Sequence, residues 1–166
     1  MSDRTVILDH EQVQRKLRRI AHQLHEEHHA EKNIVIVGIA PRGATLAKRL
    51  ATLLGTIAEF EVELVEMQLD KDLPLEKPVQ LGVEPKTLRN RTVVLVDDVL
   101  MSGRTLMHAA SYLIHVPLKR LTTVVLVDRR HRTYPIRADI VGLTLSTTLQ
   151  EHISVELGRK DSVYLK

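Results

Sequence analysis

Cysteine and tryptophan are absent from this 166-residue sequence, and aromatic residues of any kind are scarce. Without cysteine the protein cannot form disulfides, ligate a metal through thiolates or use a thiol nucleophile. An aromatic share of 2% leaves few ring faces on which the bases of a single-stranded nucleic acid can stack. The core must therefore be built from aliphatic side chains.

Long hydrophobic runs are also missing. No run approaches the roughly 20 residues that span a bilayer, and the first residues lack the apolar segment of a secretory signal. We therefore expect a cytoplasmic protein with no membrane partner. The net charge of +3 is a mild bias that does not by itself indicate a nucleic-acid partner. The length suits one domain with a real core, so we predict a single domain over residues 1–166.

The sequence does contain short apolar runs that alternate with amphipathic segments. β-Branched apolar runs are typical of buried parallel strands, and apolar residues spaced three and four apart are typical of helices. The predicted buried strands span residues 34–39, 92–96 and 121–127, and the predicted helices span residues 9–27, 43–54 and 103–115. Further strand candidates span residues 6–8, 60–69, 138–141, 153–157 and 163–165. This alternation predicts an α/β fold with a mostly parallel central sheet flanked by helices.

Residues 70–90 interrupt this alternation. The segment carries three prolines, one glycine and many charges, so we predict a long loop or flexible arm. A structureless stretch of that length in a compact domain is usually functional or disordered.

The most informative segment is the apolar run that leads into Asp97 and Asp98 and is followed by a short loop and a helix start. Adjacent carboxylates at the end of a buried strand repel each other unless a cation or hydroxyl groups bind them. They suit ribose hydroxyls or a hydrated Mg²⁺ ion. The following loop, residues 101–105, offers free backbone N–H groups at a helix N-terminus, which suit a phosphate. The segment therefore predicts a sugar-phosphate site at the carboxyl edge of the sheet.

A second turn, residues 40–43, follows the first buried strand. Its backbone N–H groups and the Arg42 guanidinium suit a pyrophosphate, although a plain strand-to-helix turn with a surface arginine has the same residues. Gly38 and Gly43 have the outer spacing of a P-loop, but position 44 is alanine instead of lysine, which argues against a P-loop kinase. No G-x-G-x-x-G run follows a strand, so dinucleotide binding has no support.

Residues 94–105 resemble the phosphoribosyl pyrophosphate motif of type I phosphoribosyltransferases. Other segments are similar to one branch of that family, PyrR, whose members are pyrimidine operon attenuators and also uracil phosphoribosyltransferases. These segments are residues 7–9, 19–22, 34–43, 46–50, 125–132 and 135–139. The resemblance covers most of the chain and is poor only over the arm at about residues 70–90.

The resemblance implies a role for each motif. Asp97 and Asp98 correspond to the acids that hold the ribose hydroxyls, and they are also the candidate ligands for Mg²⁺. The residues that correspond to the 5′-phosphate loop are Met101, Ser102, Gly103, Arg104 and Thr105. Those that correspond to the pyrophosphate loop are Ala40, Pro41, Arg42 and Gly43. Those that border the nucleobase are Val127, Asp128 and Arg129, although charged strand ends are also common on surfaces.

The N-terminal helix carries a basic face with two interpretations. It is formed by Arg15, Arg18, Arg19 and His22. Such a face is usually just solvated, but the resemblance to the attenuators suggests that it binds messenger RNA. His22, His25 and His29 also share a face that suits a metal, although nothing else in the sequence completes its coordination shell.

Several residues depart from the branch pattern. Met101-Ser102 stands where Tyr-Thr is usual, Arg130 replaces a glycine and Leu143 replaces a lysine. The arm reads Leu69-Asp70-Lys71-Asp72 instead of Tyr-Arg-Asp-Asp. These changes lie near base choice and closure, so binding of the donor is a firmer expectation than specificity for uracil.

We therefore expect a transferase that uses phosphoribosyl pyrophosphate, with Mg²⁺, and a nucleobase. Uracil is the favoured base, with UMP and pyrophosphate as the products. Two alternatives stay open: an RNA-binding regulator of pyrimidine genes with weak or no catalysis, and a transferase for a purine or another base. The resemblance also implies a homo-oligomer, either a dimer or a tetramer.

Overall fold

Strand β5 (Thr92–Leu100) is buried along all nine of its residues and lies at the centre of the main sheet. The computed structural model describes residues 3–148 and 150–166. The sheet has six strands in the order β4-β3-β2-β5-β6-β7, and every neighbouring pair is parallel except β3 and β4. The other strands are β2 (Asn33–Ile39), β3 (Glu61–Gln68), β4 (Gln80–Leu81), β6 (Arg120–Asp128) and β7 (Ile140–Thr144).

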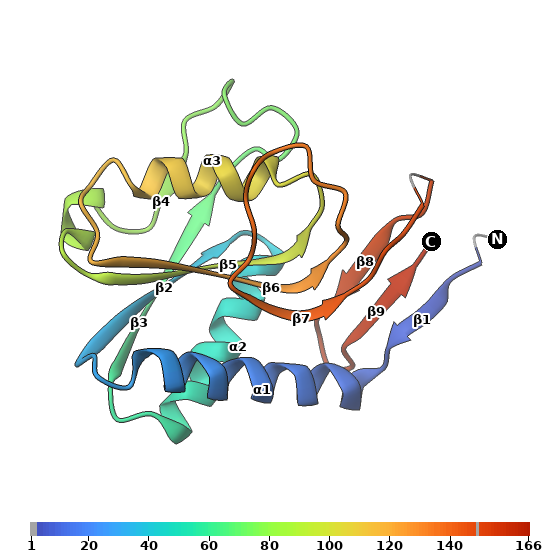
Figure 1. Cartoon of the computed structure of the whole chain (residues 1–166), viewed down its shortest axis with the longest axis horizontal. Helices are drawn as coiled ribbons and strands as arrows, with labels where there is room; N and C mark the ends of the chain where they lie inside the picture. Colours follow the sequence, from blue (N-terminus) through green and yellow to red (C-terminus); the bar gives the residue numbers. More distant parts are fainter. Residues whose placement is uncertain (1–2, 149) are drawn as a thin grey trace.

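Helices cover both faces of this sheet (Figure 1). Helices α1 (His10–His28) and α2 (Arg42–Ile57) pack on one face, and α3 (Arg104–Leu113) packs on the other. Alternate residues of each strand serve the two layers: Ile34 and Ile36 belong to the core beneath α1 and α2, whereas Val35 and Val37 belong to the core beneath α3. The predicted α/β fold with a mostly parallel sheet between helices is confirmed.

Helix α1 shows how local sequence determines an element. Asp9 is its N-cap: the Asp9 side chain accepts from the Gln12 backbone N–H at 2.8 Å, and the Gln12 side chain accepts from the Asp9 N–H at 2.9 Å. This capping box satisfies two backbone donors at the helix start. The apolar stripe of α1 is buried as its spacing predicts, and α1 contains no proline or glycine that would end the helix early.

A second, smaller sheet lies beside the main one (Figure 1). Its antiparallel strands are β1 (Thr5–Leu8), β9 (Ser162–Leu165) and β8 (Ile153–Glu156), in the order β1-β9-β8. The sequence predicted strands at these places, but it gave no sign that the two ends of the chain pair with each other. This pairing brings C-terminal residues to the carboxyl edge of the main sheet.

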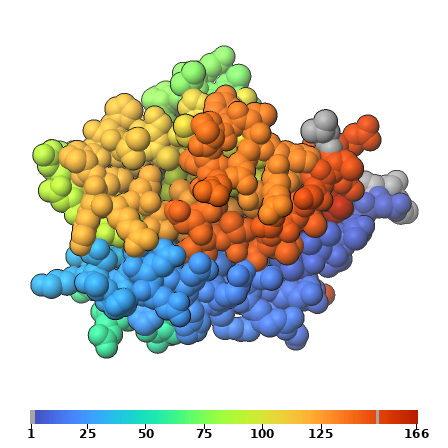
Figure 2. All heavy atoms as spheres, viewed as in Figure 1, coloured from blue at the N-terminus to red at the C-terminus, as the bar shows by residue number. Residues whose placement is uncertain are grey.

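The arm at residues 70–90 differs in part from the predicted loop. Its second half carries β4, paired with β3, and a 3-10 helix η1 (Pro85–Leu88), and Leu88 is only 1% exposed. The green segment that holds the first half projects from the body at the top of Figure 2. Its predicted flexibility stays a prediction. Of the helices in the described ranges, none is both long and apolar enough to span a membrane.

Candidate functional site

A cavity of about 500 Å³ opens at the carboxyl end of β5. Its walls come from the start of α2, the base of the arm, the end of β5 with the start of α3, and strands β8 and β9. This is the edge at which open α/β sheets bind ligands. The predicted site residues that line the cavity are Arg42, Asp97, Asp98, Met101, Ser102, Gly103, Arg104 and Thr105.

The acid pair is buried at the floor of the cavity. Asp97 and Asp98 are 2% and 6% exposed. They lie near the carboxyl end of strand β5, which runs four residues beyond its predicted end at Val96. One Asp97 oxygen accepts from the Asp98 backbone N–H at 2.9 Å. Burial, reinforced by the charge of Asp98 and opposed by Lys71, raises the pKa of Asp97 to about 7. The pair therefore favours a bound proton, cation or hydroxyl donor near neutral pH.

The loop at residues 101–103 prepares a helix start that is open to a ligand. Gly103 is the N-cap of α3 with a φ of 87°, in the left-handed region, and as a glycine it has no side chain with which to cap the helix. A Cβ at Gly103 would lie 2.8 Å from Cγ2 of Ile136. The Arg104 N–H donates to the Ser102 hydroxyl at 3.2 Å, and the helix start faces the cavity, where backbone N–H groups and a hydroxyl together suit a phosphate.

The turn before α2 touches the acid strand directly. A Cβ at Gly43 would lie 2.7 Å from the Val96 carbonyl oxygen and 3.1 Å from the Cα of Asp97, so only glycine allows this approach. Arg42 is exposed and lines the acid cavity. The α2 N-terminus thus lies beside the acids, as the predicted pyrophosphate loop requires.

Comparison with known proteins decides the family. The sequence profile of the phosphoribosyl transferase domain matches residues 3–160. The Bifunctional protein PyrR of Haemophilus ducreyi is 39% identical over 165 residues, which cover 95% of this chain and 92% of that protein. The Bifunctional protein PyrR of Bacillus subtilis is 36% identical over 170 residues, which cover 97% and 94%.

The chain belongs to the phosphoribosyltransferase family. This confirms the predicted enzyme class, a pentosyltransferase. The fold agrees: the hypoxanthine phosphoribosyltransferase of Trypanosoma cruzi superposes with a TM-score of 0.75 at 16% identity, covering 90% of this chain and 84% of that one. The enzyme of the same name from Staphylococcus aureus gives a TM-score of 0.73 at 22% identity, covering 87% and 80%.

The segment after β6 does not line the cavity of this phosphoribosyltransferase. Arg129 is 6% exposed, and its guanidinium donates to the Thr147 hydroxyl at 2.6 Å and the Thr148 carbonyl at 2.9 Å. Asp128 accepts from the Arg130 N–H at 2.9 Å. Arg129 therefore links the segment after β7 to the end of β6, and its side chain is buried and hydrogen-bonded. A base contact for Val127, Asp128 and Arg129 stays a prediction.

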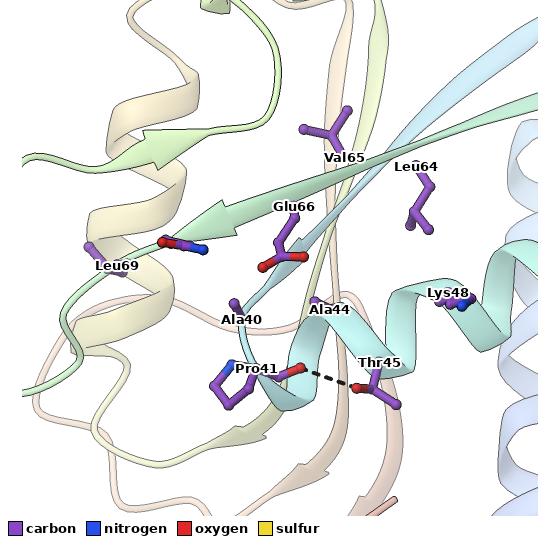
Figure 3. Close-up of a pocket in the computed structure, with 10 residues that line it drawn as sticks. Ala40, Pro41, Ala44, Thr45, Lys48, Leu64, Val65, Glu66 and Leu69 are labelled. Atoms are coloured by element: carbon purple, nitrogen blue, oxygen red, sulfur yellow. Dashed lines mark hydrogen bonds between the residues drawn. The ribbon is translucent and has the colours of Figure 1, made fainter. Parts of the chain in front are cut away.

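The turn at residues 40–43, the predicted pyrophosphate loop, is divided between two cavities. Ala40 and Pro41 border a separate groove of about 550 Å³ between α2 and strand β3. Figure 3 shows its walls: Lys48 comes from α2 and Glu66 from β3, while the Thr45 hydroxyl donates to the Pro41 carbonyl at 3.3 Å. Of the predicted loop, only Arg42 reaches the acid cavity, and Gly43 packs behind it.

The basic face on α1 is also divided. All four of its residues are exposed, but the Arg19 guanidinium also donates to the Val141 carbonyl at 3.1 Å and to the Gly142 carbonyl. Arg19 thus fastens α1 to β7. The three histidines considered for a metal form no such site, because no group of three or more His, Asp or Glu side chains within the described residues is placed to hold a metal.

Sequence reasoning did not assign five polar residues that line the acid cavity. They are Lys71, Asp72, His152, Ser154 and Lys166. Lys71 and Asp72 come from the arm, and the others come from the small sheet, where His152 and Lys166 exchange two backbone hydrogen bonds of 2.8 Å. Lys71 and Asp72 stand in the run at residues 69–72 that departs from the branch pattern, whereas the other three belong to no local motif and reach the cavity only through long-range folding.

Proposed function

We propose that the protein transfers the 5-phosphoribosyl group of phosphoribosyl pyrophosphate to uracil, giving UMP and pyrophosphate. The observation that carries this proposal is the single cavity that holds both the buried acid pair and the uncapped start of α3. Acids suit the ribose hydroxyls, and the helix start suits the 5′-phosphate. The two lie on one short stretch of chain, which could therefore hold a sugar phosphate at both of its ends.

The charges of the cavity support an anionic donor. Arg42, Arg104 and Lys166 line it together with three carboxylates, and Lys71 is paired with two of those carboxylates. In our proposal the loop at residues 101–105 binds the 5′-phosphate through backbone N–H groups and hydroxyls. Arg42 meets the pyrophosphate bidentately. Asp97 and Asp98 orient the ribose so that its anomeric carbon faces the incoming base.

Two carboxylates with substrate oxygens are the ligand set that Mg²⁺ prefers, so Asp97 and Asp98 would hold a donor-bound ion. Such an ion supplies positive charge that stabilises the departing pyrophosphate. In the reaction the bond from the anomeric carbon to pyrophosphate breaks, the bond to N1 of uracil forms, and the N1 proton is released. The transition state carries oxocarbenium character, which the nearby carboxylates stabilise electrostatically.

Uracil is favoured over other bases because the relatives at 36–39% identity are Bifunctional proteins PyrR, the branch that the sequence resembles. The departures at Arg130 and Leu143 lie on the base side and leave hypoxanthine, guanine and xanthine as competitors. A Mg²⁺-dependent assay of the donor with each of the four bases tests this. We expect UMP formation to dominate, and turnover of a purine alone would contradict the choice of uracil.

The acid pair is tested by Asp97→Asn combined with Asp98→Asn. Asparagines keep the shape but lose the charge that orients the ribose and attracts Mg²⁺. We expect donor binding measured by calorimetry to be abolished, while circular dichroism stays that of the wild type. Donor binding at wild-type strength would refute this site.

The rival function is RNA-binding regulation, favoured by the exposed Arg15, Arg18 and His22 on α1. The protein would sense UMP in the same cavity and bind messenger RNA through this face. A gel-shift titration with leader RNA, with and without UMP, tests it. Arg15→Gln with Arg18→Gln should weaken RNA binding without changing turnover. We also propose that the protein is a dimer or tetramer in solution.

A further inference from the structure

The acid pair already has a cation bound to it, and that cation belongs to the protein. Nζ of Lys71 lies 3.0 Å from Oδ1 of Asp97 and 3.6 Å from Oδ1 of Asp98. The Lys71 side chain is 37% exposed, whereas the side chains of the two acids are 3% and 9% exposed. One ammonium thus contacts both carboxylates and offsets the repulsion between them at a site largely shielded from water.

A second contact fastens the same arm residue to the phosphate loop. The Arg104 guanidinium donates to the Lys71 carbonyl oxygen at 3.0 Å. The turn around Lys71 is formed locally, because one oxygen of Asp70 accepts from the N–H groups of Asp72 and Leu73, both at 3.0 Å. The base of the arm is therefore held across the cavity, between the acid pair and the start of α3.

We propose that Lys71 is an internal counter-ion that occupies the acid pair in the free protein and must leave before the donor binds. The inference rests on the proposed function of this cavity. The Asp97 oxygen that accepts from Lys71 is a ligand that ribose hydroxyls or a divalent cation require, and an ammonium within 4 Å repels such a cation. Only the fraction of molecules in which Lys71 has withdrawn is competent to bind, so Lys71 lowers the apparent donor affinity by that fraction.

Lys71→Met tests this proposal, since methionine keeps the length of the side chain and removes its charge. Lys77→Met is the matched control: Lys77 is on the same arm, its side chain is 76% exposed, and its contact with Asp70 at 3.8 Å lies outside the cavity. In calorimetry with Mg²⁺ and phosphoribosyl pyrophosphate, we expect Lys71→Met to bind the donor about tenfold more tightly than the wild type. Lys77→Met should bind it like the wild type.

A second readout needs no donor. Chymotrypsin cleaves after Leu75, which is 86% exposed at the tip of the arm. Because the contact with the acids holds the base of the arm, the ligand-free Lys71→Met protein should be cut several-fold faster than the wild type. Lys77→Met should be cut at the wild-type rate.

Equal or weaker donor binding by Lys71→Met overturns the proposal, because it would mean that Lys71 plays no part in donor binding or helps it. Equal cleavage rates overturn it as well. The Asp97→Asn, Asp98→Asn protein separates this failure from that of the proposed function. If that variant loses the donor while Lys71→Met gains nothing, only the counter-ion is wrong. If neither the wild type nor Lys71→Met binds the donor, the proposed function fails. The cleavage rates alone then decide on Lys71.

Discussion

At the scale of single residues, Gly103 carries the strictest requirement in the site. Its φ of 87° is unfavourable for any L side chain, and a Cβ would meet Ile136 at 2.8 Å. We expect Gly103→Ala to lower the free energy of unfolding by about 2 kcal/mol and to weaken donor binding. Urea denaturation measures the first and calorimetry the second.

Gly55→Ala is the control for that experiment. Gly55 lies inside α2, and nothing lies within 4 Å of a Cβ placed there. Alanine should raise the free energy of unfolding by about 0.5 kcal/mol, because it is the better helix former. If both variants changed stability alike, the backbone at Gly103 would not be special.

Arg130 shows the opposite case, a non-glycine residue in the left-handed region with a φ of 65°. Arg130 stands where the branch that the sequence resembles has glycine. The left-handed φ gives the physical reason, because glycine adopts this φ without strain. We expect Arg130→Gly to raise the free energy of unfolding by up to about 1 kcal/mol. Asn90→Gly, at a φ of 59°, should give no gain because asparagine tolerates this region. A loss of stability in Arg130→Gly would contradict this explanation.

Residue chemistry could be predicted from the sequence where it is local. Asp97, Asp98 and the loop that follows them are neighbours in the chain, so their meeting at one strand end needs no knowledge of the rest. Lys71 lies 26 residues before Asp97 and reaches it only because the arm folds back. Arg129 was predicted as a base contact, which stays a prediction, and its hydrogen bonds to Thr147 and Thr148 are contacts that no local pattern could reveal.

At the scale of elements, the small sheet depends on one buried carboxylate. The Asp161 side chain is fully buried and accepts from Arg49 on α2, Gln14 on α1 and the Gly158 N–H, the last at 3.0 Å. Although burial opposes the charge of Asp161, these donors outweigh it and lower its pKa. Asp161→Asn should lower the free energy of unfolding by about 2 kcal/mol at pH 7, because Arg49 loses its partner. Chemical denaturation measures this loss.

The pH dependence of that loss is a sharper test. Because the folded-state pKa of Asp161 is lowered, its contribution is present above the unfolded value of about 4 and disappears as pH falls through the folded value. The stability difference between the wild type and Asp161→Asn should therefore begin to narrow as pH falls below about 4 and should go on narrowing at lower pH. Glu156→Gln is the control, since its pair with Arg4 is about half exposed on both sides and should change stability by less than about 0.5 kcal/mol. A difference as large at pH 3 as at pH 7 would contradict the assignment.

Element types were more predictable than their ends and partners. The pattern located the central strands, because burial on both faces leaves a continuous apolar run, and it located α1, α2 and α3, because burial along one stripe leaves a helical period. Strand β5 was predicted too short, because Asp97 and Asp98 interrupt the apolar pattern while the backbone continues in the sheet to Leu100. The β1-β9-β8 sheet was missed, because short strands carry little periodicity and pairing between chain ends leaves no local signal.

At the scale of the whole molecule, the cavity exists because three distant parts of the chain converge on the end of β5. The start of α2 brings Arg42, the arm brings Lys71, and the small sheet brings His152 and Lys166. The sheet order alone places the first of these, since β2 and β5 are neighbours. The other two depend on the folding-back of the arm and on the pairing of β1 with β9.

A crystal structure of the protein with Mg²⁺ and phosphoribosyl pyrophosphate tests the central claim most directly. We predict the 5′-phosphate within hydrogen-bond distance of the backbone N–H groups at residues 102–105, a ribose hydroxyl on Asp97 or Asp98, and Lys71 withdrawn from both. A donor bound only in the groove beside Pro41, or a ribose turned away from the two acids, would contradict the account.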